Sequence, residues 1–174
     1  MNEATALVPG IRESDSGRLI ACRTAGHLSR MHQAPSDVMT TEPIVRELRR
    51  LAADLVYSSE GDHPFETLHV RDPHPGQPLS VKRMLTLLKV GADAQLQVVT
   101  LERVLGRHTV FTDSADVETQ RIRPRYEALQ RCLEHELRDT MALRTGNPPV
   151  VDVWLVGRLP NGDIAGYHTV AIET

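Results

Sequence analysis

The fold class is decided by residues 150–173, whose sequence is VVDVWLVGRLPNGDIAGYHTVAIE. Two apolar runs, 150–158 and 164–173, flank a turn with Asn161-Gly162 at its centre, which is the pattern of an antiparallel β-hairpin. Apolar residues occupy both alternating faces of the first run. A strand of this kind is typical of a sheet that helices cover on both sides.

Three amphipathic patterns upstream of this hairpin predict helices for the covering layers. The first has Ile44, Leu48 and Leu51 at helical spacing, and Thr41 is its predicted N-cap. The second covers residues 80–90, with Ser80 as its cap, and the third and longest covers residues 125–142. The apolar stripe of the longest helix consists of Tyr126, Leu129, Leu133, Leu137 and Met141.

Between the helices, short strands are predicted at residues 65–70 and 97–100, with loops at 57–64 and 71–78. These elements predict an α/β (α+β) fold, a three-layer α/β/α sandwich. Its sheet is expected to be mixed but largely antiparallel, with the C-terminal hairpin as its last two strands.

The first 41 residues differ from the rest, because no helical or strand period lasts longer than one turn. We interpret residues 1–41 as a flexible N-terminal extension, with a short docked helix as the alternative. Residues 42–174 are expected to form the folded domain.

Composition excludes several classes of protein. The 174 residues carry a formal charge of −3, which disfavours direct binding of nucleic acid. The two cysteines, Cys22 and Cys132, form no disulfide framework, and no apolar run has the length of a signal peptide or a membrane span. We therefore expect a cytoplasmic protein without membrane contact, monomeric when free.

Catalytic motifs are incomplete throughout the chain. His135-Glu136 begins like the zinc motif HExxH, but Asp139 stands where the second histidine is required. His63, His69 and His74 are close in sequence but lack the spacing of a metal site. Hydrolase chemistry at Glu60, Asp62 and Glu66 is a distant alternative, because acids in and beside a loop are usually solvated. We expect no enzyme activity, no cofactor and no metal ion of the protein's own.

The same acidic segment carries a family resemblance. Residues 59–66, Ser-Glu-Gly-Asp-His-Pro-Phe-Glu, resemble the Ser-Glu-Ser-Asp-Tyr-Pro-Phe-Glu motif of the nuclease A inhibitor family, with Gly61 and His63 as the departures. The resemblance continues in residues 126–129, in the strand and turn of residues 151–166, and in the terminal Ala-Ile-Glu-Thr. It covers roughly residues 42–174.

This resemblance implies an inhibitor that binds and blocks the active site of a sugar-non-specific endonuclease of the ββα-metal type. It implies that Glu60 enters the active site and that Thr174 approaches the divalent ion of the nuclease. Their neighbours Ser59, Asp62 and Glu173 complete the candidate contacts. Because the last apolar strand runs almost to the end of the chain, we expect the sheet to hold Thr174 in place.

One alternative function of another class remains open. The chain could be a non-catalytic intracellular protein-interaction module that keeps the fold without a nuclease partner. A nuclease assay with and without the protein separates the two hypotheses, and so does the presence of a ββα-metal nuclease gene beside its own.

Overall fold

A five-stranded antiparallel sheet forms the centre of the molecule, with the strand order β3-β7-β6-β5-β4. The structure is a computed structural model that describes residues 38–91, 94–109 and 117–174, all within one compact unit, Pro35–Thr174. Residues 1–37, most of the predicted extension, lie outside the described residues. The strands are β3 (Glu66–Val70), β4 (Leu96–Val99), β5 (Arg138–Asn147), β6 (Val150–Arg158) and β7 (Ile164–Ile172).

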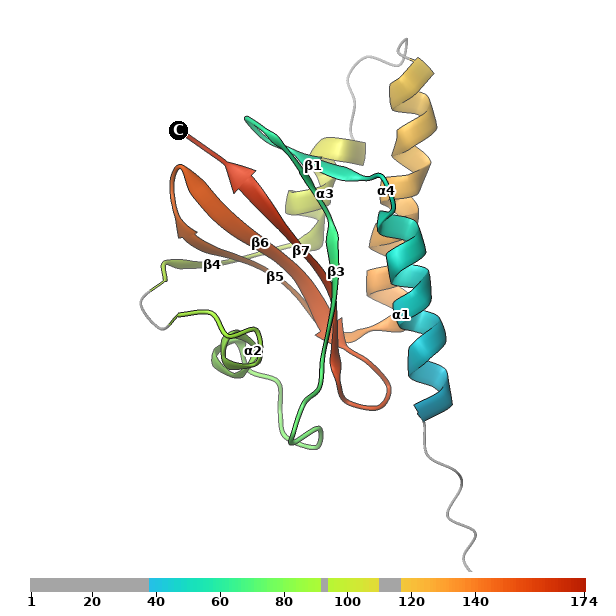
Figure 1. Ribbon diagram of the computed structural model, residues 1–174, viewed down its shortest axis with the longest axis vertical. Coiled ribbons are helices and arrows are strands. Elements are labelled where there is room, and N and C mark those ends of the chain that lie inside the picture. Colours follow the sequence, from blue (N-terminus) through green and yellow to red (C-terminus); the bar gives the residue numbers. More distant parts are fainter. Residues whose placement is uncertain (1–37, 92–93, 110–116) are drawn as a thin grey trace, which may run out of the picture. The chain divides into compact units, whose positions relative to one another are not determined.

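Helices cover both faces of this sheet (Figure 1). One face packs against α1 (Val38–Ala52), α3 (Leu101–Thr109) and α4 (Val117–Glu136), and the other against α2 (Val81–Leu87). The larger core joins the three helices to β6, and its members include Leu48, Leu105, Leu129, Val153 and Leu155. The smaller core joins α2 to the opposite face, and it consists of Met84, Leu143, Val156 and Ile164 with partly buried neighbours.

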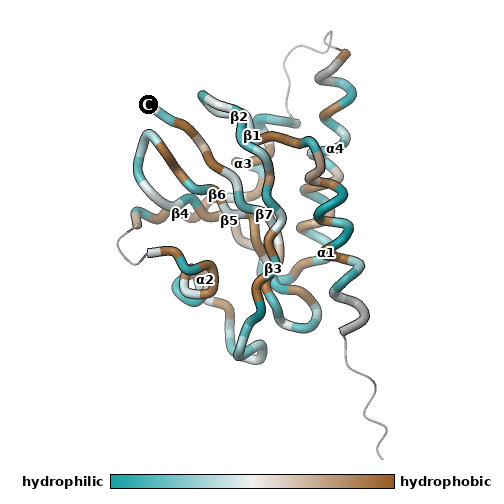
Figure 2. The backbone as a smooth tube through the Cα atoms, viewed as in Figure 1, coloured by the Kyte–Doolittle hydropathy of each residue, from teal (hydrophilic) through white to brown (hydrophobic). Residues whose placement is uncertain are grey.

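The predicted three layers are therefore confirmed, and so is the C-terminal hairpin of β6 and β7. Every strand pair among the described residues is antiparallel, so the sheet shows no parallel pair there. The Asn-Gly turn has the expected chemistry, since Gly162 has φ of 92° and a Cβ there would come within 2.2 Å of Pro75. Figure 2 shows apolar residues concentrated in the central strands.

The prediction of one helix over residues 125–142 is wrong at its C-terminal end. Helix α4 ends at Glu136, and residues from Arg138 onward form β5 between β4 and β6. Ala142 is buried in the larger core and Leu143 in the smaller one, so β5 is apolar on both faces and shows no strand period. The predicted helix stop at residues 145–149 is consequently the end of β5, residues 145–147, and the turn at Pro148 and Pro149 that leads into β6.

Two other predictions near the start of the domain need correction. Helix α1 begins at Val38, so residues 38–41 are helical rather than part of a flexible extension, and Thr41 is a buried helical residue instead of the N-cap. The predicted loop at 57–64 contains a short hairpin of β1 (Val56–Ser58) and β2 (Asp62–Pro64). Burial of Tyr57 holds this polar segment against the domain, and polar composition alone does not reveal such packing.

The other predicted elements are confirmed with small shifts of their ends. β3 and β4 fall on the predicted strands, and residues 71–78 form a loop. The hydroxyl of Ser80 caps α2 by accepting a hydrogen bond from the backbone N–H of Arg83 at 3.2 Å. The segment 107–120, which the sequence left open, holds the end of α3 and the start of α4, with residues 110–116 outside the described part.

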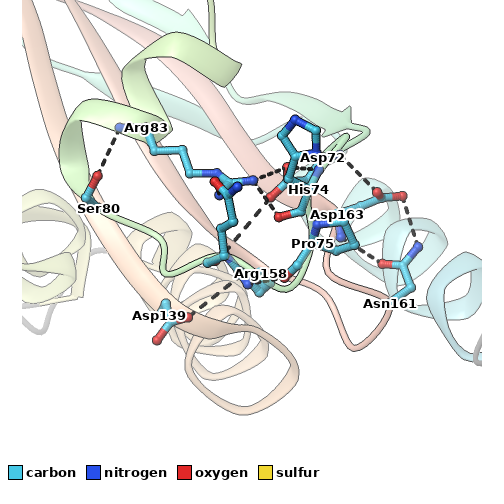
Figure 3. Close-up of polar contacts among 10 residues, drawn as sticks. Asp72, His74, Pro75, Ser80, Arg83, Asp139, Arg158, Asn161 and Asp163 are labelled. Atoms are coloured by element: carbon cyan, nitrogen blue, oxygen red, sulfur yellow. Dashed lines mark hydrogen bonds and ion pairs between the residues drawn. The ribbon is translucent and has the colours of Figure 1, made fainter.

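A buried carboxylate fastens the proline-rich loop 71–78 to the rest of the domain (Figure 3). Arg83 of α2 donates to Asp72 Oδ1 at 2.6 Å, and a second guanidinium, that of Arg158 on β6, lies 4.0 Å from Oδ2. Arg158 also donates to the carbonyl oxygens of Pro75 and Gln77, at 2.5 and 2.8 Å. This network ties β6, α2 and the loop together at the β6–β7 turn.

Candidate functional site

Glu60 and Thr174 lie side by side, although 114 positions separate them in the chain. The backbone N–H and the hydroxyl of Thr174 both donate to Glu60 Oε1, at 3.1 and 2.9 Å. Both residues are exposed, and Glu60 stands at the turn of the β1–β2 hairpin. The sequence predicted both as site residues, and the structure brings them together at one corner of the domain, which we call the tip (residues 59–62 and 173–174).

Ser59 connects the two halves of the tip. Its hydroxyl accepts a hydrogen bond from the backbone N–H of Ile172 at 2.9 Å and donates to the carbonyl of Gly61 at 3.2 Å. The backbone N–H of Glu60 also donates to the carbonyl of Ile172, at 3.2 Å. The hairpin turn is thus bonded to the end of β7, which holds Glu60 beside the last residue.

An aromatic cluster beneath the hairpin supports the tip from inside. Tyr57 of β1 is buried, with its ring centroid 6.2 Å from that of Phe65 and 5.3 Å from that of His108. The hydroxyl of Tyr126 on α4 donates to the carbonyl of Val56 at 2.5 Å. Arg107 stacks over Tyr57 and donates to the carbonyl of Ser58 at 3.1 Å. The hairpin therefore rests on α3 and α4.

The supporting role of α3 was missed from the sequence, because residues 107–120 have no clear period. Only Tyr126 had a signal, as part of the family motif in residues 126–129. Arg107 and His108 contact residues of β1 that lie about 50 positions earlier in the chain. Such contacts produce no pattern in the local sequence.

His108 makes this support sensitive to acid. Burial, with a smaller contribution from the positive charge of Arg107, lowers the pKa of its imidazole to about 4. A histidine with a lowered folded-state pKa stabilises the fold above its unfolded pKa, about 6.5, and this stabilisation is lost as the pH falls towards 4. The negative charge of Asp62 opposes the shift only weakly.

We therefore expect the free energy of unfolding to fall by on the order of 2 kcal/mol between pH 7 and pH 4 through His108 alone. His108→Phe keeps a flat ring stacked on Tyr126, whose centroid lies 4.6 Å away, but removes the titration. Urea unfolding of both proteins across this pH range measures the difference. Equal pH dependence in the two proteins would contradict the prediction.

Glu173 is placed differently from its neighbours in the predicted set. Its carboxylate lies 2.5 Å from the guanidinium of Arg144 on β5, and its backbone N–H donates to the carbonyl of Pro149 at 3.0 Å. Its side chain is thus engaged within the domain, beside the β5–β6 turn. Arg144 had no signal in the sequence, because its segment was predicted to follow a helix.

Asp62 is exposed at the start of β2, opposite Ser58 in the hairpin register. Neither Asp62 nor Glu60 forms an ion pair with any residue in the described part of the chain. His63, one of the departures from the family motif, is half-buried, and its carbonyl accepts a hydrogen bond from the Thr169 hydroxyl at 3.3 Å. Glu60 and Asp62 therefore present carboxylates that no cation of the described residues neutralises, whereas Glu173 of the tip is paired with Arg144.

Other chemistry suggested by single residues finds no support in the geometry. No group of three or more His, Cys, Asp or Glu side chains among the described residues is arranged to hold a metal ion. His69 pairs instead with Asp163, at 3.1 Å. Burial raises the pKa of the Cys132 thiol to about 11, so this cysteine is protonated at neutral pH and a poor nucleophile.

Comparison with known proteins identifies the family of the chain. The family model for nuclease A inhibitor-like protein matches residues 42–174, which include both halves of the tip. The chain belongs to the nuclease A inhibitor-like family. The resemblance in residues 59–66 and in the C-terminal strands is thereby confirmed at the level of the family. No curated protein matches the sequence.

Membership of the nuclease A inhibitor-like family suggests a nuclease inhibitor with a protein partner rather than a catalyst. In this inhibitor-like domain, the family match starts inside α1, a few residues after the helix begins. None of the helices in the described residues is sufficiently long and apolar to cross a membrane.

Proposed function

We propose that this protein inhibits a sugar-non-specific endonuclease of the ββα-metal type by placing the tip in its active site. The observation that carries the proposal is the pair of hydrogen bonds from Thr174 to Glu60 Oε1, which join two distant candidate residues at one exposed corner. In this proposal Glu60 and Thr174 contact the nuclease, and Asp62 adds negative charge beside them.

The chemistry of a nuclease cleft fits these groups. Such a cleft binds phosphodiesters next to a divalent cation, so it attracts oxygen anions, and hard cations prefer carboxylate ligands. Both hydrogen bonds from Thr174 go to Oε1 of Glu60, and Oε2 accepts none from a described residue. A carboxylate that is held on one side and open on the other can occupy the position of a phosphate oxygen without a large loss of side-chain entropy.

Ser59 and Glu173 act as positioning residues in this proposal. Ser59 fastens the hairpin turn to the end of β7, and Glu173 fastens the terminal residues to Arg144. Arg144 is then required for affinity although it does not touch the nuclease, because a loose terminus would have to be ordered on binding.

Arg144→Gln is expected to weaken inhibition about three- to tenfold, the cost of immobilising one or two side chains on binding. Amide hydrogen exchange should become faster at Glu173 and Thr174. The pair Arg144→Glu with Glu173→Arg restores the ion pair with reversed charges and should recover most of the affinity. Arg103→Gln is the matched control, since Arg103 lines the same depression beside β5. Equal loss in Arg103→Gln, or no rescue by the swapped pair, would contradict the positioning role.

The decisive experiment is a nuclease assay. A sugar-non-specific endonuclease of the ββα-metal type is titrated with the purified full chain, with DNA and RNA as substrates. Stoichiometric loss of both activities supports the proposal. A complex that forms without loss of activity would favour the interaction module instead, and no complex would overturn the proposal.

A further inference from the structure

Among the described residues, helices cover only half of one face of the sheet. Helices α1, α3 and α4 pack over the first face, whereas α2, with seven residues, is the one described helix on the second (Figure 1). Its residue Met84 packs on Leu143, Val156 and Ile164, towards the β6–β7 turn. The half of this face nearer the β5–β6 turn and the C-terminus carries no described helix.

Exposed apolar side chains gather on this uncovered half. Val98, Val150 and Leu96 are 60 %, 52 % and 38 % exposed, and they are three of the four exposed large apolar residues in the described part of the chain. The register places these residues on the α2 side of the sheet. Val98 is paired with Leu143, which belongs to the core under α2, and paired residues share a face. Leu96 lies two residues before Val98 on β4 and therefore points to the same face. Val150 lies on the same side, six positions before Val156 on β6. We call this surface, Leu96, Val98 and Val150 with Val170 and Ile172, the open face.

A tryptophan bordered by acids forms the edge of the open face. The Trp154 ring lies 4.2 Å from that of His168, and its Nε1–H donates to the Thr145 hydroxyl at 3.0 Å. His168 in turn lies 2.8 Å from Asp152 and 3.7 Å from Glu66, two carboxylates whose side chains are 44 % and 73 % exposed. A fixed aromatic ring with polar partners is a common anchor in protein interfaces, and the two acids favour a cationic partner surface.

The open face is continuous with the tip. Val150 is paired with Ile172, and the backbone of Ile172 is bonded to Ser59 and Glu60. A stable protein complex covers about 800 Å² on each partner, some 20–30 residues, which the few residues of the tip do not provide. The adjoining surface must supply the rest of the contact, and the exposed apolar residues lie on this side of the tip.

We infer that the open face is the second part of the nuclease interface. Its apolar residues contact the wall beside the nuclease cleft, and Asp152 and Glu66 face basic residues at the rim of the cleft. This inference rests on the proposed function, and it adds a surface that gives affinity and selects among nucleases that share the same metal site.

The test compares exposed valines on two surfaces. Val98→Lys and Val150→Lys place a cation in the open face, and Val117→Lys, at a position 77 % exposed on α4, is the matched control. Surface changes of this kind rarely alter stability by more than about 0.5 kcal/mol. We expect the first two variants to raise the Kd for the endonuclease at least about tenfold and the control to change it less than about twofold. Thermal unfolding verifies that all three are folded.

The outcomes separate this inference from the proposed function. If Glu60→Ala weakens inhibition but neither Val98→Lys nor Val150→Lys does, the open face is not part of the interface and the tip proposal stands. If the wild-type chain does not inhibit, both fail.

A photo-crosslinking residue at Val98 of the full chain identifies the occupant directly. Crosslinks to the endonuclease support the inference. Crosslinks only to a second copy, or only to residues 1–37 of the same chain, would overturn it.

Discussion

Glu60→Ala is expected to weaken inhibition of the nuclease by about 30-fold to several thousandfold, equivalent to about 2–5 kcal/mol of binding free energy. The loss is this large because the variant removes a carboxylate that would pair with a buried cationic site, and it leaves that site unpaired. Most of the change should appear as faster dissociation, which stopped-flow or surface-based kinetics can measure.

The charge and the shape of Glu60 can be separated. Glu60→Gln keeps an oxygen that accepts from Thr174 and loses only the charge, so we expect a smaller defect than for alanine. Glu134→Ala, which removes an exposed acid of α4, is the matched control and should inhibit like the wild type. If Glu60→Ala were as good an inhibitor as Glu134→Ala, the assignment of the tip would be refuted.

The position of Thr174 allows a companion experiment. Adding a short peptide after Thr174 places extra residues beside Glu60, where the nuclease would sit. We expect this extension to abolish inhibition, whereas the same peptide at the N-terminus should leave it unchanged. Inhibition by both fusions alike would exclude insertion of the terminus.

Asp72→Ala should have the largest effect on stability. The Asp72 side chain is fully buried, and its removal leaves the largely buried guanidinium of Arg83 without its anion and that of Arg158 with only the exposed Asp139. Breaking a buried pair from one side costs at least about 3 kcal/mol, which for a domain of this size lowers Tm by roughly 10 °C. Asp139→Ala is the control, because Asp139 is 57 % exposed and 3.9 Å from the same Arg158, and it should cost less than about 1 kcal/mol.

The ionisation of Asp72 adds a pH dependence to the same experiment. Burial is the largest influence and disfavours its charge, but the backbone N–H of His74 and the Arg83 guanidinium together outweigh it and hold the pKa below the usual value. A carboxyl with a lowered folded-state pKa stabilises the fold above its unfolded pKa, about 3.8, and loses this effect in more acid solution. The gap in stability between wild type and Asp72→Ala should therefore narrow below pH 4, and a gap independent of pH would contradict this account.

The two sets of variants should act independently. The Asp72 network lies at the β6–β7 turn, whereas the tip lies at the other end of β7 (Figure 1). Well below its Tm, Asp72→Ala is thus expected to inhibit normally, while Glu60→Ala should unfold like the wild type.

The sequence alone predicted those elements that depend only on residues close together in the chain. The Asn161-Gly162 turn, the cap at Ser80 and the helical period of α1 depend on residues within a few positions of each other, and each was predicted correctly in kind. The family motif in residues 59–66 and the Glu-Thr terminus also indicated Glu60 and Thr174 as candidate contacts.

Tertiary structure decided the rest, because the deciding contacts join distant segments. Residues 138–142 continue a helical pattern, yet pairing with β4 and β6 makes them a strand, and only this pairing places Arg144 against Glu173. The polar segment around Glu60 becomes a hairpin because Tyr57 is buried and because Ser59 bonds to Ile172, 113 positions away. Hydrogen bonds and burial that join residues so far apart leave no periodic pattern along the chain. The sequence therefore indicated the candidate residues of the tip, and only the tertiary structure brings them together.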